Sequence, residues 1–416
     1  MISDGLQNDL GSGCSFDEYC PMLNISQCAF TEHRFAFSIL VYNPLANNVS
    51  SFIRIPVKNK HVYRVLNSQN SEVETQLVPI PEEVLRIPGR HSSAKYELVF
   101  FAENIPGLGS KTFKFEHISK KEMEVHLEKI RKTIFLENSH IKVEVNKKGV
   151  LERLKTETSD IHLTQDFAYY KGAVGDNTDF VKRASGAYIF RPKLNLVIPI
   201  GEPQSATFIK GPLVQEVHQK FNDWTSQVIR LYRGQKHLEL EWIIGPLPAL
   251  HHNMPGSEVI SRYKSDIDSG DLFKTDSNGR FMIPRQRDYR PTWDLNLTEP
   301  ISSNYYPVVS RMSIEDSNSV SEQKKQVWVM TDRAEGGTSM HSGEMELMLH
   351  RRLFNDDAFG VGEPLNETAY GKGLVVRGKH KLLLCEGDCE IASRRIAEEE
   401  LMKPVIFFGE YCSNLR

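Results

Sequence analysis

The chain lacks the features that would place it in a membrane or on nucleic acid. It has no run of about 18 apolar residues, so no segment is long enough to cross a bilayer as a helix. Its 51 lysines and arginines nearly balance 54 aspartates and glutamates, which leaves a formal charge of -3. A surface without a basic excess is a poor partner for a polyanion. We therefore expect neither a membrane span nor a nucleic-acid partner.

Motifs for metal ligation and nucleotide binding are also missing. The sequence has no Cys-x-x-Cys, His-x-His, His-x-Asp or His-x-x-x-His spacing that would begin a zinc site. It has no Gly-x-Ser-x-Gly elbow, phosphate-binding loop or dinucleotide fingerprint. The adjacent His251 and His252 stand among proline and glycine, where a solvated loop is expected. We recognise no metal ligand in this chain.

The first residues contain neither a basic nor an apolar export region, so we expect no signal peptide in this chain. Four sequons that would accept an N-glycan nevertheless begin at Asn24, Asn48, Asn296 and Asn366. Glycans are added only in the secretory pathway, so the two observations point in opposite directions.

The six cysteines leave two interpretations open. Cys20 and Cys28 flank a short loop that a disulfide between two antiparallel arms would close, as is expected in an oxidising compartment. The alternative is a set of unrelated buried thiols.

Many short segments have the composition and period-two alternation of β-strands. They are residues 34–42, 51–57, 95–101, 140–146, 149–157, 213–221, 226–232, 237–245, 325–331 and 344–352. Only residues 389–404 read as a convincing helix, which Pro404 ends. Because no strand–helix–strand rhythm appears, we predict a mainly β protein with a small β-sandwich followed by a large antiparallel one.

The segment HLELEW shows the alternation most clearly. Leu238, Leu240 and Trp242 should point to one side of a strand, and Glu239 and Glu241 to the other. This pattern predicts an antiparallel sheet with one face in water.

Two polar segments are candidates for a site. Asp356 and Asp357 stand before a glycine-rich turn, but a glycosidase needs two carboxyl groups on opposite sides of the bond, which sequence neighbours serve badly. They are expected to shape a turn. Between residues 271 and 308, an aromatic and polar cluster either forms a sugar-facing platform or braces two loops through Arg–Asp pairing. The cluster consists of Arg287, Asp288, Tyr289, Arg290 and Trp293.

Twelve blocks of sequence carry a resemblance to a known family. They are CPMLNISQC, VYNPL, ASGAYIFRP, LVQEVH, HLELEW, EVISRY, TDSNGR, RDYRPTW, NYYPV, DRAEGG, LMLHRRL and DDAFGVGEPLNET. In this order they resemble the lysosomal-type α-mannosidases of glycoside hydrolase family 38, over nearly the whole chain. The resemblance is to the C-terminal β portion, without the N-terminal catalytic domain.

A charged stretch with neither a helical nor a strand period reads as a linker between the two sandwiches, and the resemblance completes the domain plan. This plan comprises an N-terminal segment at 1–30 with a disulfide loop, a small β-sandwich at 31–117 and a linker at 118–132. A large sandwich of the galactose-mutarotase-like, mannosidase C-terminal type follows at 133–416, and the family pattern continues beyond it. Pairing of Cys20 with Cys28 is also implied.

The resemblance further implies a retaining, zinc-dependent α-mannosidase that removes α-linked mannose from N-glycans. The family's zinc ligands, nucleophile and acid belong to the missing domain, so we expect this chain alone to be inactive. Tyr188 resembles a tyrosine that reaches the family's active site. Asp357 and Phe359 are further candidates for contact with the substrate, because the resemblance places their loop near the sugar. Many relatives have arginine at the position of Phe359.

The implied partners are mannose-containing oligosaccharides, the missing N-terminal domain and a second copy in a homo-oligomer, and the implied location of the parent enzyme is the lysosome. Two alternatives remain: a carbohydrate-binding module without catalysis, and a structural β-sandwich protein with exposed apolar patches.

Overall fold

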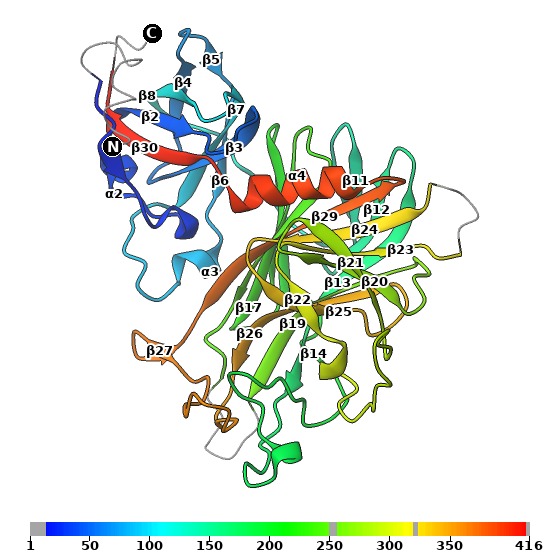
Figure 1. Cartoon of the computed structure of the whole chain (residues 1–416). Helices are drawn as coiled ribbons and strands as arrows, with labels where there is room; N and C mark the ends of the chain where they lie inside the picture. The colour runs from blue at the N-terminus through cyan, green and yellow to red at the C-terminus, as the bar shows by residue number, and fades with distance from the viewer. Residues whose placement is uncertain (1–13, 249–255, 319–322, 413–416) are drawn as a thin grey trace. The chain divides into compact units, whose positions relative to one another are not determined.

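A computed structural model describes residues 14–248, 256–318 and 323–412 of the chain. The backbone divides into two compact units (Figure 1). The first consists of Met1–Leu127, Ile209–Gln215 and Glu399–Arg416, and the second of Glu128–Phe208 and Glu216–Glu398. In the described part, no helix has the length and apolarity that a membrane crossing requires.

The first unit contains two antiparallel sheets. A six-stranded sheet has the order β1-β30-β2-β8-β4-β5, and a three-stranded sheet the order β3-β7-β6. The strands are β1 (Glu18–Tyr19), β2 (Ala36–Tyr42), β3 (Val49–Val57), β4 (His61–Asn67), β5 (Glu72–Val73), β6 (Thr75–Pro79), β7 (Tyr96–Ile105), β8 (Ser110–Glu122) and β30 (Val405–Glu410). Short helical turns are η1 (Leu23–Ile25), α2 (Ala29–His33) and α3 (Glu82–Leu85).

Aromatic side chains from both sheets fill the core of this unit. Phe37 of β2 stacks on Phe115 of β8 with ring centroids 4.7 Å apart, and Phe100 of β7 packs edge-on against Phe115 at 5.6 Å. All three are fully buried. Burial of alternate residues on facing sheets is what makes this unit a small sandwich.

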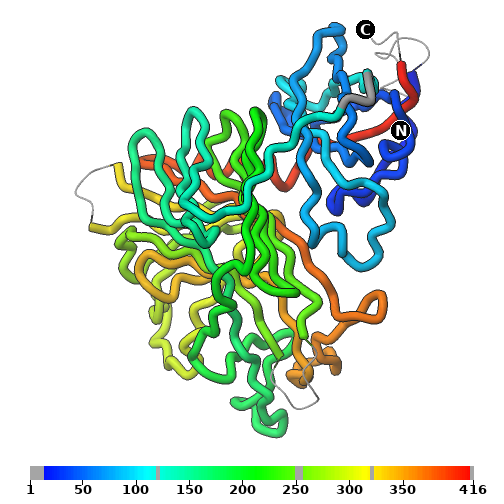
Figure 2. The backbone as a smooth tube through the Cα atoms, turned by 180° about the vertical axis from the view of Figure 1, so that it is seen from behind, coloured from blue at the N-terminus to red at the C-terminus, as the bar shows by residue number. Residues whose placement is uncertain are grey.

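The last strand of the chain, β30, belongs to the first unit. It pairs with both β1 and β2, and Figure 2 shows it in red beside the blue strands. Phe408 is fully buried in the core of this unit. The predicted second domain at 133–416 thus includes a strand that pairs in the first unit, because sequence order gives no sign that the chain returns to the sheet of β1 and β2.

The predicted linker at 118–132 is largely strand. The extended β8 reaches Glu122, and β9 (His126–Lys129) follows after three residues. The predicted helix is present as α4 (Glu390–Leu401) and ends before Pro404. Its Ala397 packs with Trp328 and Leu383.

The second unit is a sandwich of two large sheets. One has the order β10-β11-β12-β13-β19-β26-β25-β22, with β14 paired to β13, and the other the order β21-β20-β23-β24-β29-β18-β17-β16-β15-β9. A small hairpin is β27 (Thr368–Ala369) with β28 (Lys372–Gly373).

The strands of the first large sheet are β10 (Ile134–Glu137), β11 (Ile141–Val145), β12 (Leu151–Thr156), β13 (Asp160–Lys171), β14 (Ile198–Pro199), β19 (Ser257–Ser265), β22 (Tyr306–Val308), β25 (Glu335–Thr338) and β26 (Glu344–Arg352). Those of the second, besides β9, are β15 (Ser205–Lys210), β16 (Val214–Lys220), β17 (Thr225–Tyr232), β18 (Leu238–Ile244), β20 (Leu272–Ser277), β21 (Phe281–Gln286), β23 (Arg311–Glu315), β24 (Lys325–Thr331) and β29 (Val376–Glu386). The 3-10 turns are η2 (Phe180–Lys182) and η3 (Ser302–Asn304).

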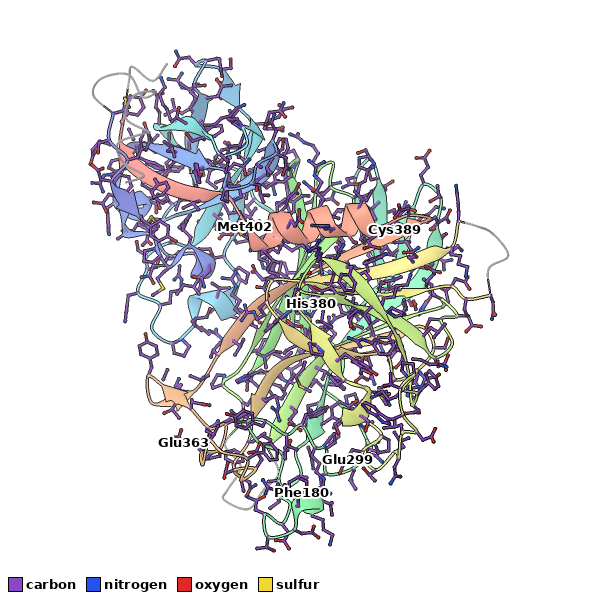
Figure 3. The ribbon with its side chains drawn as sticks, viewed as in Figure 1. Phe180, Glu299, Glu363, His380, Cys389 and Met402 are labelled. Atoms are coloured by element: carbon purple, nitrogen blue, oxygen red, sulfur yellow. A yellow bond between two sulfur atoms is a disulfide. The ribbon has the colours of Figure 1, made fainter. Side chains whose placement is uncertain are left out.

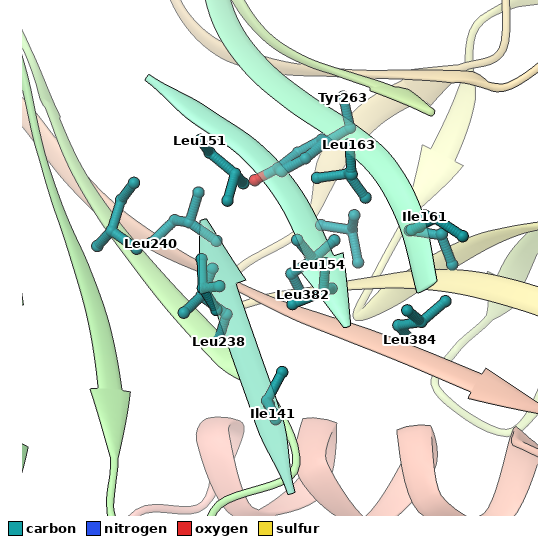
Figure 4. Packing of buried hydrophobic residues seen from close by; sticks show 14 of the residues in the cluster. Ile141, Leu151, Leu154, Ile161, Leu163, Leu238, Leu240, Tyr263, Leu382 and Leu384 are labelled. Atoms are coloured by element: carbon teal, nitrogen blue, oxygen red, sulfur yellow. The ribbon is translucent and has the colours of Figure 1, made fainter. Parts of the chain in front are cut away.

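Aliphatic residues from the two sheets meet in one core. Leu238 and Leu240 of β18 and Leu382 of β29 face Leu154 and Ile161 of the other sheet (Figure 4). Leu238 and Leu240 alternate along β18, as the period-two pattern predicted. The mainly β fold with a large antiparallel sandwich is confirmed.

The prediction of a wet face on β18 is wrong. Glu239 and Glu241 do point away from the leucines, but both are buried. The buried guanidinium of Arg230 on β17 binds Glu239 at 3.0 Å, Glu241 at 3.2 Å and Glu216 at 2.8 Å. Alternation of charge and apolarity cannot separate a solvated face from one whose charges neutralise each other.

All six cysteines are paired. Cys20 bonds Cys28, the bridge that the sequence and the family resemblance suggested. Two further bridges, Cys14–Cys412 and Cys385–Cys389, were not predicted. Cys14–Cys412 joins residues 398 positions apart and holds Cys14 beside the end of strand β30.

Removing the Cys14–Cys412 bridge should destabilise the first unit more than removing a short-range bridge. By loop entropy, the double change Cys14→Ser with Cys412→Ser should lower the free energy of unfolding by roughly 3 to 4 kcal/mol more than Cys385→Ser with Cys389→Ser. Urea titrations of the two variants measure this difference. Equal losses of stability in the two variants would contradict the dependence on loop length.

His350 of β26 should make the second unit less stable at acid pH. Burial, and then the charge of Arg352, lower the pKa of its imidazole to about 4 from the ordinary 6.5. Between pH 6.5 and pH 4 this histidine is protonated in the unfolded chain but neutral in the folded chain. The free energy of unfolding therefore falls by roughly 1 to 3 kcal/mol as the pH drops from 6.5 toward 4.

The variant His350→Gln should therefore lose less stability than the native chain between pH 7 and pH 4.5, as followed by urea unfolding at each pH. His341→Gln, at an exposed position before the same strand, is the matched control. An unchanged pH slope in His350→Gln would contradict the assignment.

Candidate functional site

Tyr188 lies in a tight turn that follows η2 in the second unit. The amide of Gly186 donates to the carbonyl of Ile189 at 2.8 Å, which closes the turn around Tyr188. The side chain of Tyr188 is 64% exposed. The turn therefore presents the ring and the phenol to the outside.

The carboxylate of Asp357 holds this turn through hydrogen bonds from its backbone amides. Its Oδ2 accepts hydrogen bonds from the amides of Tyr188 at 2.7 Å and Ile189 at 2.9 Å, and its Oδ1 accepts from the amide of Phe359 at 3.1 Å. The residue has no exposed surface. A carboxylate with three amide donors is a strong local anchor, because each bond is charge-assisted.

Gly186 makes this approach possible. A Cβ at this position would lie 2.6 Å from the Cβ of Asp357, closer than real side chains come. Ala358, between Asp357 and Phe359, has a positive φ of 54°. The two loops are thus fitted to each other at the level of the backbone.

Three aromatic rings gather over this anchor. The ring of Phe359 lies 6.3 Å from that of Tyr188 and 6.4 Å from that of Phe180, measured between centroids. The guanidinium of Arg183 lies 4.9 Å from the Phe180 centroid and 5.2 Å from the Phe359 centroid. We call Phe180, Arg183, Tyr188 and Phe359 the aromatic patch.

The aromatic patch is open to solvent. Phe180 is 70% exposed and Phe359 49% exposed. Figure 3 shows Phe180, Glu299 and Glu363 at the same end of the second unit, away from Cys389. Exposed rings held in place can stack on an apolar ligand face, and a phenol can donate or accept a hydrogen bond.

Asp356, the neighbour of Asp357, takes part in this region through its backbone carbonyl. The side-chain amide of Asn177 donates to the Asp356 carbonyl at 2.6 Å. Since both oxygens of Asp357 are taken by amides, the adjacent acids do not form a pair around a common ligand. Asp357 was expected to touch substrate; its complete burial makes it an anchor for the loop that carries Phe359.

The zinc that the resemblance implies has no set of ligands among the described residues. Among residues 14–248, 256–318 and 323–412, no group of three or more His, Cys, Asp or Glu side chains converges as metal ligands would. The six cysteines are consumed in disulfides. His251 and His252 fall outside the described residues.

In the cluster of residues 287–293, Asp288 and Arg290 make hydrogen bonds to other residues, whereas two aromatic rings are exposed. Asp288 exchanges hydrogen bonds with Asn304, at 2.9 Å through its amide and 2.6 Å through its carboxylate. Arg290 donates to the carbonyls of Ser303 and Tyr289. The rings of Tyr289 and Trp293 remain exposed.

The bracing that the sequence suggested for this cluster therefore exists, but it uses Asn304 and backbone carbonyls instead of Arg–Asp pairs. The contribution of Phe180 and Arg183 to the aromatic patch was missed. The signal available was their position directly before the turn that carries Tyr188.

The four sequons differ in how far their asparagines are engaged. Asn24, Asn48 and Asn296 are exposed, and Oδ1 of Asn48 accepts a hydrogen bond from the amide of Gly107 at 3.2 Å. Asn366 is partly buried, and its Oδ1 accepts a hydrogen bond from Arg352 at 2.8 Å.

The chain is similar in sequence to several α-mannosidases. The lysosomal α-mannosidase of Homo sapiens is 38% identical over 398 residues, which cover 93% of this chain and 37% of that protein. The lysosomal α-mannosidase of Bos taurus is 40% identical over 396 residues, 94% of this chain and 37% of that protein. An α-mannosidase of Arabidopsis thaliana is 34% identical, over 95% of this chain and 40% of that protein. The chain thus spans about two fifths or less of the length of these relatives.

Solved structures agree on the fold. An α-mannosidase from Enterococcus faecalis V583 superposes with a TM-score of 0.54 at 11% identity, over 94% of this chain and 48% of that chain. At this identity the likeness concerns the fold alone. The profile of the glycosyl hydrolases family 38 C-terminal domain matches residues 136–359, more than half of the chain. The chain therefore belongs to glycosyl hydrolase family 38, and its second unit carries the family's C-terminal domain.

Proposed function

We propose that this chain is the β-sandwich part of an α-mannosidase that removes α-linked mannose from N-glycans, and that the aromatic patch borders the sugar site. The observation that supports the role of the patch is the anchor at Asp357. It fixes the exposed Tyr188 and Phe359 side by side on a rigid backbone. Binding residues are most effective when their support is rigid before the ligand arrives.

In this proposal Tyr188 contributes its phenol and Phe359 its ring. The phenol hydroxyl can donate to a sugar oxygen and accept from a sugar hydroxyl. The face of Phe359 offers apolar surface to the C–H groups of a pyranose. Phe359 has no guanidinium to bind hydroxyls, so the loop acts through shape and through its backbone.

The groups that break the glycosidic bond would come from the part of the family's protein that this chain does not match. A retaining glycosidase needs two carboxyl groups about 5 Å apart, one as nucleophile and one as acid. Beside Tyr188, Asp357 is buried and used by three amides, and it offers no free oxygen for either task. Zinc, which would grip sugar hydroxyls in the complete enzyme, finds no ligand set in the described residues.

We further propose a lysosomal parent enzyme. Three disulfides are stable in an oxidising compartment and are rare in the cytosol. The named relatives of Homo sapiens and Bos taurus are lysosomal. Glycans at Asn24, Asn48, Asn296 and Asn366 belong to the same proposal.

Hydrolysis of a chromogenic α-mannoside at acidic pH, with and without zinc, tests the proposal. The 416-residue chain alone should show no turnover. Joined to the preceding part of the Bos taurus relative, it should give zinc-dependent turnover. In the joined enzyme Tyr188→Phe should lower kcat/KM by about 10- to 100-fold, because a hydrogen bond to the reacting sugar is lost.

Tyr370→Phe is the matched control, since Tyr370 is also well exposed, at 72%, but lies at the β27–β28 hairpin. Zinc-dependent turnover by the chain alone would contradict the proposal, because the β-sandwiches would then carry a complete site. Equal activity of Tyr188→Phe and Tyr370→Phe would remove Tyr188 from the sugar site.

A further inference from the structure

The turn that carries Tyr188 is also held from its carbonyl side. The carbonyl of Ile189, the residue after Tyr188, accepts a hydrogen bond from Nη2 of Arg351 at 2.9 Å. The hydroxyl of Ser185 lies 3.1 Å from the same carbonyl. Asp357 binds only the amides of this turn, so these contacts form a second, separate attachment.

Arg351 is itself fixed by Glu258. Oε1 of Glu258 accepts from Nε of Arg351 at 3.0 Å and from Nη2 at 2.8 Å. The Ser185 hydroxyl donates to the same carboxylate oxygen at 2.8 Å. Glu258 has no exposed surface.

The ion pair belongs to the framework of the sheet. Glu258 on β19 and Arg351 on β26 are direct cross-strand partners in the nine-stranded sheet. Strand pairing therefore fixes where the guanidinium sits, and the guanidinium fixes the Ile189 carbonyl. A site attached to strands is held more precisely than one attached to loops.

The next residue along the chain is packed against the same sheet. The ring of Phe190 meets that of Tyr305 edge-on at 4.9 Å and that of Tyr170 at 5.7 Å. The guanidinium of Arg351 lies 5.9 Å from the Phe190 centroid. Ring packing alone allows sliding, whereas the hydrogen bond to Ile189 sets the register of the turn.

We infer that Arg351 and Glu258 are positioning residues that set the orientation of Tyr188 through the Ile189 carbonyl. Arg351 supplies the hydrogen bond, and Glu258 holds the guanidinium fork in the required plane. The claim that Tyr188 meets a sugar rests on the proposed function. The mechanical link from the sheet to Tyr188 does not.

Chemistry explains why the pair is an arginine and a glutamate. A guanidinium can hold a carboxylate with two nitrogens and still direct an N–H at a carbonyl, which a lysine ammonium cannot do in one plane. Burial raises the pKa of Glu258, and the charge of Arg351 opposes this rise. The carboxylate therefore depends on its partner to stay ionised inside the sheet.

Amide hydrogen exchange of the purified chain tests the mechanical link. Arg351→Lys should speed exchange at Tyr188 and Ile189 by about tenfold or more, because a local opening of the turn becomes easier. Glu258→Gln keeps the shape of the side chain and should give a smaller increase at the same amides. Arg352→Lys is the matched control, since the neighbouring Arg352 binds Leu247 and Asn366 instead.

Faster exchange at Tyr188 and Ile189 in Arg351→Lys, with native exchange there in Arg352→Lys, is the expected result. Native exchange at both amides in Arg351→Lys and in Glu258→Gln would overturn the inference, because Asp357 would then suffice. If Arg351→Lys fails to fold, Glu258→Gln decides.

A kinetic cycle in the joined enzyme separates positioning from general stability. Arg351→Lys should lower kcat/KM, and adding it to Tyr188→Phe should cost little more, because both changes disable the same hydroxyl. Fully additive losses would overturn the positioning role. If the joined enzyme shows no activity at all, the proposed function fails while the exchange result still judges the link to Tyr188.

Discussion

The aromatic patch depends on one buried carboxylate. Asp357 has no contact with solvent and binds three backbone amides, two from the turn of Tyr188 and one from its own loop. Two loops about 170 residues apart are thereby joined at a point where neither has regular secondary structure. Their exposed rings can lie together only because the backbones beneath them are locked.

The same principle recurs in the second unit, where charges enter the interior as partners. Arg230 binds three glutamates, two of which also bind Lys379, and Arg351 binds Glu258 across a strand pair. Burial of each pair costs desolvation free energy but fixes the geometry of both side chains. Removing one partner would leave the other as an unpaired buried charge. In the case of Arg351, the fixed geometry extends from the sheet to the Tyr188 turn.

Sequence patterns were sufficient wherever the determining contacts are local. Period-two alternation located strands such as β2, β11, β18 and β26, although it missed β4, β13, β19 and β29, and Pro404 marked the end of α4. They failed where a distant partner decides. The residues around Glu239 do not indicate that it will form a buried ion pair with Arg230. The residues around Phe408 do not indicate that its strand will pair with β1 and β2. Only the family resemblance identifies Tyr188 as a candidate, because the residues around it do not distinguish it from other tyrosines in strands or turns.

Amide exchange of paired aspartate variants tests the central role of Asp357 most directly. Asp357→Asn keeps the size of the side chain but replaces one acceptor oxygen with a donor, so exchange at Tyr188, Ile189 or Phe359 should rise by about tenfold or more. Asp356→Asn, one residue away, should leave these amides at native rates. Equal exchange in both variants and the native chain would contradict the account, because the aromatic patch would then be held without the buried carboxylate.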